Sequence, residues 1–286
     1  NFGNTILDKK NLTKYLSKID ILIIELSSYQ LDKLKFLKLH YALITNIFSD
    51  HLEYHKNIIN YISSKFRIQD CLNKSSYFCV SKNLYLKYRS FIKINKNRLI
   101  LNDEKITHKK DLTNYIRDIN LNSVKNLIYY IDPRLKIKNV NISNDLNFRV
   151  QLIYNKNILK VYNDSKCTNL NNAIYKNNLI NSTKKILILG GKFKKQDKNL
   201  KFNIKNTLVL IFGNQRDLFI NQLNLIDSNY FKFNRLIELI NFLKLIVKLR
   251  KYEYILFSPG GESFDSFKNY IDRGNYFNRL IKKAIS

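Results

Sequence analysis

Short apolar runs alternate with segments of helical periodicity in the first half of this chain. Residues 21–25 (Ile-Leu-Ile-Ile-Glu) and 41–47 are nearly continuous apolar runs, which predicts strands buried on both faces. Between residues 55 and 72 the apolar positions recur at helical spacing, which predicts an amphipathic helix. Less distinct patterns predict a strand at 77–80 and a helix at 123–131, which Pro133 would end.

The second half repeats this alternation more regularly. Predicted strands lie at 148–154, 158–162, 185–189, 208–212 and 254–257, and predicted helices at 169–179, 236–249 and 264–284. Three of the strands run into glycines, at Gly190-Gly191, Gly213 and Gly260-Gly261. A strand, a glycine turn and a helix in succession are typical of a doubly wound α/β domain, in which ligands bind at the carboxyl ends of the strands. We expect two α/β domains, residues 1–146 and 147–286.

Composition narrows the class of protein. The 286 residues suit two domains, and 45% apolar residues are enough to form real cores. The net charge of +28 suggests a polyanion partner. However, the Lys and Arg residues are spread along the whole chain, and heavy use of Lys, Asn, Ile, Tyr and Phe points instead to compositional bias. We therefore expect no specific nucleic-acid partner, and no apolar run is long enough for membrane insertion.

The cysteine pattern indicates a reducing compartment. Cys71, Cys79 and Cys167 are odd in number and widely spaced, so they form neither a disulfide framework nor a zinc motif. We expect free thiols and a cytoplasmic location.

Three candidate groups in the first half follow predicted strands. Glu25 stands where a strand ends and could hold a metal ion, although an acid at a strand end is more often simply solvated. Asp50-His51 follows the next strand, and His51 could ligate a metal or be structural. Lys65 lies on the helix that follows. It is either a surface lysine or, if deprotonated near a metal, an amine that could form a carbamate with carbon dioxide.

Polar groups in the second half also cluster where strands end. Residues 163–169 (Asn-Asp-Ser-Lys-Cys-Thr-Asn) precede a predicted helix, whose amino terminus favours anions. Lys192, Lys194 and Lys195 follow the first Gly-Gly pair. The longest motif, residues 258–277, begins Ser-Pro-Gly-Gly-Glu-Ser, and Ser263 is a natural N-cap for the helix after it.

In this order, the motifs resemble those of the Mur ligase family, and most closely the members that add D-glutamate. The resemblance rests on residues 25–30 (Glu-Leu-Ser-Ser-Tyr-Gln), 163–169 and 258–274, and it is weakest over 82–144. It implies an incomplete central ATPase-type domain followed by a Rossmann-like carboxyl-terminal domain. The family's P-loop, G-x-x-G-x-G-K-[ST], does not occur in this chain. We therefore expect the UDP-binding domain and the phosphate cradle to be missing, which agrees with the absence of an initial Met.

The resemblance also assigns roles to individual residues. Glu25 would hold the magnesium ion that bridges the ATP phosphates, and His51 with a carbamylated Lys65 would serve a second one. Asn4 would contact the reacting substrate. ATP would be contacted by Asn122, Arg149 and Asp164, the last at the ribose. D-glutamate would be surrounded by Lys166, Thr168, Lys194, Ser263 and Tyr270.

These roles imply an ATP- and Mg²⁺-dependent ligase that joins D-glutamate to UDP-N-acetylmuramoyl-L-alanine through an acyl phosphate, in peptidoglycan synthesis. We expect a monomer, and we expect the chain without its P-loop to bind ATP poorly and to be inactive. The alternative is a non-catalytic remnant or binding module of the same fold. It is favoured by the altered adenine element, where Asn122 is the one Asn that remains, and by the drift towards a strongly basic composition.

Overall fold

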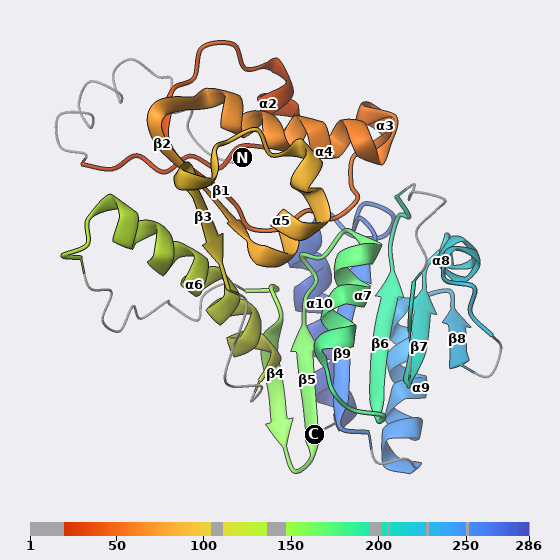
Figure 1. Cartoon of the computed structure of the whole chain (residues 1–286). Coiled ribbons are helices and arrows are strands. Elements are labelled where there is room, and N and C mark those ends of the chain that lie inside the picture. Colours follow the sequence, from red (N-terminus) through yellow and green to blue (C-terminus); the bar gives the residue numbers. More distant parts are fainter. Residues whose placement is uncertain are drawn as a thin grey trace, which may run out of the picture.

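Two β-sheets, one from each half of the chain, organise the computed structural model (Figure 1). It describes residues 20–103, 111–135, 147–194, 202–204, 206–226, 229–249 and 252–285. The first sheet is parallel, in the order β1-β2-β3, with strands β1 (Leu39–Ile44), β2 (Leu72–Ser81) and β3 (Leu99–Asn102). The helices of this half are α2 (Ser28–Lys33), α3 (Leu52–His55), α4 (Ile58–Phe66), α5 (Lys82–Tyr88) and α6 (Leu112–Ile131), with short 3₁₀ turns at Arg67–Cys71, Arg89–Phe91 and Lys96–Arg98.

Helix α4 packs its apolar face on the first sheet. The Asn57 side chain accepts a hydrogen bond from the Asn60 N–H and caps the helix at its start. From α4, Phe66 is 2% exposed and packs in one cluster with Phe78 and Val80 of β2, both 0% exposed. The predicted strands at 41–47 and 77–80 and the predicted helix after residue 55 are confirmed by β1, β2 and α4.

The strand predicted at residues 21–25 is wrong. Residues 21–27 form no helix or strand and pair with no strand in the described part of the chain. The side chain of Ile23 is 87% exposed and that of Ile21 is 55% exposed. A run of β-branched residues favours an extended backbone, but a buried strand also needs a neighbour on each side and cover on each face.

The second sheet has six strands in the order β4-β5-β9-β6-β7-β8, and only the β4–β5 pair is antiparallel. Its strands are β4 (Gln151–Lys156), β5 (Leu159–Asn163), β6 (Lys185–Gly190), β7 (Thr207–Phe212), β8 (Tyr230–Phe233) and β9 (Tyr254–Gly260). Its helices are α7 (Leu170–Leu179), α8 (Arg216–Leu223), α9 (Leu236–Leu249) and α10 (Tyr270–Ile285). The parallel strands with helices between them confirm the predicted doubly wound α/β class.

Strand β6 shows why the apolar runs of this half are continuous. Its Leu187 and Leu189 belong to the core beneath α7 and α8, whereas Ile186 and Ile188 belong to the core beneath α9 and α10. All four side chains are 0% exposed. Because helices cover both faces, both sets of alternating positions must be apolar.

Three further details differ from the sequence predictions. Helix α10 begins at Tyr270 rather than at 264, and the Asn269 side chain accepts hydrogen bonds from the N–H groups of Ile271 and Asp272. Ser263 is therefore not the N-cap of α10. Helix α6 is longer than predicted, although it ends before Pro133 as expected. The sequence patterns also missed β3, β8 and α8, which are short.

Helix α6 spans the two halves. It contacts β2 and β3, yet at its start Leu112 joins the core of the second sheet and the Thr113 hydroxyl donates to the Val150 carbonyl at 2.6 Å. We propose that the domain boundary lies at 146/147, since strands before it form the first sheet and strands after it form the second.

Candidate functional site

The loop that follows β1 carries a strained histidine. His51 lies in the left-handed region with φ 56°, which is unusual for a residue with a side chain. Its N–H donates to Asp50 Oδ1 at 2.9 Å, and its Nδ1 lies 2.9 Å from the Tyr29 hydroxyl. Such strain is maintained where surrounding contacts fix a functional side chain. Tyr29 belongs to α2, which a capping box at Ser27 starts.

Lys65 faces this loop from α4. Its Nζ lies 5.9 Å from the centre of the Tyr61 ring, and the His51 ring centre lies 6.4 Å from the same ring. Burial lowers the pKa of the Lys65 amine, while the charges of Asp50 and Glu25 oppose that shift. Glu25 itself is exposed, on the segment without helix or strand that precedes α2. The structure thus brings Glu25, His51 and Lys65 into one region, around Asp50.

Asp164, at the end of β5, is 1% exposed and fully engaged by the protein. Its Oδ2 accepts from Lys176 Nζ and from the Ser258 hydroxyl, both at 2.7 Å, and its Oδ1 accepts from the Val150 N–H at 3.2 Å. Burial disfavours the Lys176 ammonium, but the Asp164 charge outweighs this effect and raises the pKa of Lys176. The sequence predicted a ribose contact for Asp164, which stays a prediction, and it missed Lys176.

A lysine and two aromatic rings lie next to this buried pair. Lys166 Nζ sits 3.9 Å from the centre of the Tyr270 ring, and that ring is 6.4 Å from Phe148 in an edge-on arrangement. A cation over an aromatic face is attracted by the ring quadrupole. Thr168 is half-buried on the same loop, and Arg149 is exposed beside Phe148.

Close approach of two glycine turns positions Lys194. The backbones of Lys192 and Glu262 pair, with N–H to O distances of 2.8 and 2.9 Å in the two directions. A Cβ atom on Gly191 would lie 2.3 Å from the Glu262 carbonyl oxygen, so only glycine permits this contact. Lys194 consequently lies beside Glu262, with Nζ 3.5 Å from the carboxylate. Ser263, the next residue, is 2% exposed.

The two groups of residues meet across the two halves of the chain. Lys194 Nζ lies 3.2 Å from Asp50 Oδ1, and the Asn169 amide donates to the Ser49 carbonyl. The rings of Phe48 and Tyr175 lie 5.4 Å apart. Residues 48–50 therefore connect the loop of the first sheet to the carboxyl-end loops of the second.

Arg273 is buried beneath the loops that carry Ser165 and Gly261 and stabilises both through hydrogen bonds. It is 0% exposed, and it donates to the carbonyls of Gly261 at 2.9 Å and Ser165 at 2.8 Å, and to the Ser165 hydroxyl at 3.2 Å. Burial lowers its pKa to about 10, so the guanidinium stays charged at neutral pH. The sequence motif contains Arg273 but gave no hint that its charge points inwards.

Two predicted residues do not join this region. Asn4 lies outside the described residues. Asn122 is half-buried midway along α6, and no hydrogen bond connects it to the other predicted residues in the described ranges. Its proposed contact with adenine stays a prediction.

The side chains in this region only partly meet the needs of a Mg²⁺ ion. The described residues contain no cluster of three His, Cys, Asp or Glu side chains able to hold a metal. Glu25, His51 and Lys65 become a suitable set only when the lysine carries a carbamate, which supplies a further anionic oxygen. Glu25, Asp50 and the carbamate of Lys65 would then place three negative charges in one region, which favours a divalent cation there. These residues therefore fit Mg²⁺ only if Lys65 is carbamylated.

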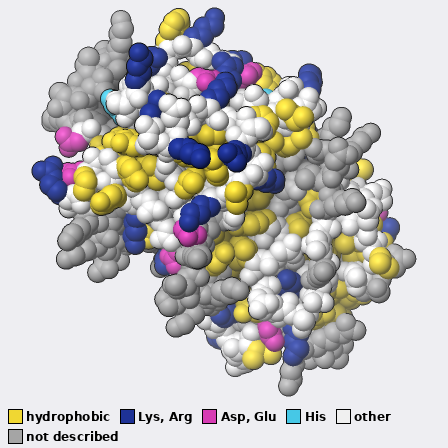
Figure 2. Space-filling model, viewed as in Figure 1, with side chains coloured by type: hydrophobic (Ala, Val, Ile, Leu, Met, Phe, Trp, Pro, Cys, Tyr) yellow, Lys and Arg dark blue, Asp and Glu magenta, His cyan; other side chains and the backbone are white. Residues whose placement is uncertain are grey.

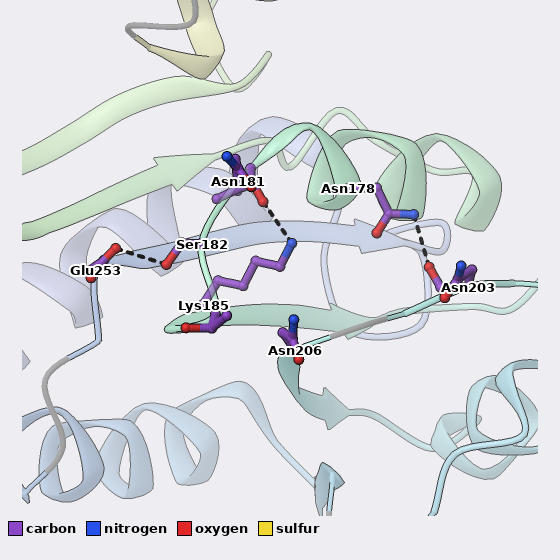
Figure 3. A pocket seen from close by; sticks show the side chains of 9 residues that line it. Asn178, Asn181, Ser182, Lys185, Asn203, Asn206 and Glu253 are labelled. Carbon is purple, nitrogen blue, oxygen red and sulfur yellow. Dashed lines mark hydrogen bonds between the residues drawn. The ribbon is translucent and has the colours of Figure 1, made fainter.

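A hollow of about 600 Å³ lies at the opposite edge of the second sheet, where β6, β7 and β9 begin (Figure 3). Lys185 lines this hollow, and its Nζ donates hydrogen bonds to the carbonyls of Asn177 at 3.0 Å and Ile180 at 2.8 Å. Both carbonyls lie at the end of α7 and each also accepts a backbone N–H, from Ile180 and Ser182 respectively, so Lys185 adds a side-chain cap to this helix end.

The surface agrees with a dispersed positive charge. On the face shown in Figure 2, Lys and Arg side chains are scattered among polar and apolar ones and do not form one continuous patch. The three cysteines are free. None of the helices in the described ranges has the length and apolar character needed to cross a bilayer.

Comparison with known proteins identifies the family. Residues 1–159 match the family model of the Mur ligase middle domain. The chain belongs to the Mur ligase family, as the sequence motifs predicted. Similar curated proteins include the UDP-N-acetylmuramoylalanine–D-glutamate ligases of Prochlorococcus marinus (30% identical, over 98% of this chain and 66% of the relative) and Petrotoga mobilis (28% identical, over 96% and 67%). The chain thus spans about two thirds of the length of these relatives.

Solved structures share the fold. The MurF ligase of Thermotoga maritima in complex with ADP aligns with a TM-score of 0.55 at 10% identity, covering 86% of this chain and 62% of that one. A MurF structure from Acinetobacter baumannii aligns with a TM-score of 0.53, also at 10% identity, covering 84% and 60%. At this identity the likeness concerns the fold alone, and it confirms the predicted α/β architecture.

Proposed function

We propose that this protein acts in peptidoglycan synthesis by joining D-glutamate to UDP-N-acetylmuramoyl-L-alanine, with ATP activating the carboxylate of the UDP-linked substrate as an acyl phosphate. One observation carries the proposal: the Lys194–Asp50 contact joins the two groups of predicted residues across the two halves of the chain. The names of the curated relatives support the choice of D-glutamate.

The second half would bind the amino acid. D-glutamate has two carboxylates and one amine, and two lysines, Lys166 and Lys194, offer a cation for each carboxylate. Ser263 and Thr168 would add hydroxyl donors. The Tyr270 ring, whose centre lies 3.9 Å from Lys166 Nζ, would hold this lysine in place by a cation–π contact. The amine would be left to attack the acyl phosphate carbon that the first half presents.

The first half would stabilise the phosphoryl end. Glu25 would hold one Mg²⁺ ion, and His51 with a carbamylated Lys65 would serve a second; when bound, such ions neutralise developing charge on a transferred phosphoryl group. Arg149 is exposed, and its guanidinium would contact ATP. Contacts of residues 48–50 with the second half would exclude water from the acyl phosphate.

The test is the incorporation of radiolabelled D-glutamate into UDP-N-acetylmuramoyl-L-alanine with ATP and Mg²⁺. It compares the longest protein that the coding sequence yields with the 286-residue chain. We expect incorporation by a form that includes a P-loop and none by the 286-residue chain. In the form that includes a P-loop, Lys65→Ala and His51→Ala should each abolish incorporation. Lys93→Ala, on the exposed surface, is the matched control and should leave it unchanged. Full activity of the Lys65 and His51 variants would refute the assigned roles and favour a non-catalytic module.

A further inference from the structure

The two ring nitrogens of His51 have different surroundings. Nδ1 lies 2.9 Å from the Tyr29 hydroxyl oxygen. Nε2 has no hydrogen bond to the described residues, since Asp50 Oδ2, at 3.8 Å, is beyond hydrogen-bonding distance. The other Asp50 oxygen accepts from the His51 backbone N–H at 2.9 Å and lies 3.2 Å from Lys194 Nζ. Tyr29 is therefore the group that determines which nitrogen of the neutral ring carries the proton.

Glu53 sets the direction of the hydrogen bond between Tyr29 and His51. Burial raises the pKa of the Tyr29 hydroxyl, as do the charges of Glu53 and Asp50 and a hydrogen bond to Glu53. The phenol thus keeps its proton at neutral pH. A carboxylate can only accept and a phenol has one proton, so Tyr29 donates to Glu53. The Tyr29 oxygen is then left to accept from His51 Nδ1–H. The Glu53 carboxylate, 3.6 Å from Nδ1, also favours a proton on that nitrogen by its charge.

The Tyr29 ring is held in a fixed position. It lies on α2, which the Ser27 capping box starts. Its ring centre lies 4.8 Å from that of His51 and 4.6 Å from that of Tyr54. The Tyr54 hydroxyl in turn donates to Asp32 Oδ2 at 3.1 Å. Because the His51 backbone is also constrained, with φ 56°, the phenol and the imidazole meet in one geometry.

We propose that Tyr29 and Glu53 are positioning residues that keep the proton of neutral His51 on Nδ1, which leaves the lone pair of Nε2 available to a metal ion. This inference rests on the proposed function, in which His51 serves a Mg²⁺ ion. Histidines that ligate metals commonly donate their other ring N–H to an oxygen, which fixes the tautomer and the orientation of the ring. Tyr29 lies in the motif at 25–30, but the sequence assigned no role to it or to Glu53.

The experiment is nitrogen NMR of the 286-residue chain labelled at its four histidines, at pH 8, where an ordinary imidazole is neutral. The chemical shifts of the two ring nitrogens distinguish the one that carries the proton from the one that does not. The signals of His51 are identified by their absence in His51→Ala. We expect the wild type to carry the proton on Nδ1, and a proton on Nε2 would overturn the inference.

Two variants test the positioning residues one at a time. Glu53→Ala changes a side chain that is 60% exposed and frees the Tyr29 proton for His51 Nδ1, so the His51 proton should move to Nε2. Tyr29→Phe removes the oxygen that accepts from Nδ1 and should also populate the proton on Nε2. Tyr54→Phe is the matched control: its hydroxyl bonds Asp32, so its loss should keep the proton on Nδ1. If the proton stays on Nδ1 in either test variant, that residue does not position the ring.

A titration with Mn²⁺, a paramagnetic substitute for Mg²⁺, separates this inference from the proposed function. It is done in bicarbonate buffer, which supplies carbon dioxide to Lys65. The ion should broaden the His51 ring signals, and Tyr29→Phe, which changes no charge, should need roughly 10- to 100-fold more ion for equal broadening. Equal broadening at equal concentration would overturn the positioning role. The expected tautomers without any effect of Mn²⁺ on His51 would refute its metal role in the proposed function and leave the hydrogen-bond arrangement in place.

Discussion

Gly274, in helix α10, offers a sharp test of the packing behind the amino-acid site. A Cβ atom at this position would lie 2.2 Å from Cδ1 and 2.6 Å from Cε1 of the Phe148 ring. Phe148 is 7% exposed and has a φ of 63°, so its ring has little room to move away. The Gly274 carbonyl also accepts a hydrogen bond from Asn163 at 3.0 Å, which fixes the helix against β5.

Two opposing effects determine the result of Gly274→Ala. Alanine is favoured over glycine inside a helix by about 1 kcal/mol. Overpacking against a buried ring costs roughly 1–3 kcal/mol, and contacts this short belong at the upper end of that range. We therefore expect a net loss of about 2 kcal/mol in the free energy of unfolding. In a Phe148→Ala background the ring is gone, and the same change should stabilise by up to about 1 kcal/mol.

The assay is chemical denaturation followed by circular dichroism, for the wild type, both single variants and the double variant. A double-mutant cycle isolates the coupling between the two positions, which should be about 3 kcal/mol. The sign of the alanine effect must reverse between the two backgrounds. Equal destabilisation in both, or stabilisation of the wild type, would refute the argument that the Phe148 ring dictates glycine at this position.

Three further predictions concern charged and nucleophilic groups. Lys176→Met should cost about 3–5 kcal/mol in unfolding free energy, since it leaves the buried Asp164 carboxylate unpaired, and adding Asp164→Asn should recover part of it. Because the folded pKa of Lys176 is raised above 10.5, its contribution is complete below that pH and is lost as the pH rises through the folded value, so alkaline denaturation curves should be flatter in Lys176→Met. Lys65, whose pKa burial lowers, should be acetylated faster at pH 8 than the exposed lysines by mass spectrometry, and equal rates would contradict the lowered value. Iodoacetamide should modify the half-buried Cys71 while sparing Cys79, whose pKa burial raises to about 11, and rapid loss of both thiols would argue against this core.

Much of the second half could be predicted from sequence because its strands are buried on both faces. Leu187 and Ile188 point to opposite sides of β6 and are both 0% exposed, so local composition alone reveals the strand. The same criterion failed for residues 21–25. An apolar run records a preference for burial, whereas a strand exists only where another strand supplies hydrogen bonds.

The candidate site divides in the same way. Motif order identified the family, and it named Lys65, Lys166 and Lys194 as chemistry-bearing residues, because residue type and local spacing are written in the chain. Their partners were not predictable. Lys194 and Asp50 are separated by 144 positions, and no local pattern encodes a contact that depends on how two domains dock.

The sequence by itself determined the α/β class, the family and the identities of the polar groups at the strand ends. Only the tertiary structure decided that the Asp164 carboxylate is hydrogen-bonded by Lys176 and Ser258, and that Arg273 points inwards and stabilises two loops. It also decided that Asp50 forms an ion pair with Lys194 across the two halves. The physical reason is that charge–charge and hydrogen-bond energies depend on distance and burial, and both are set by the packing of segments far apart in the chain.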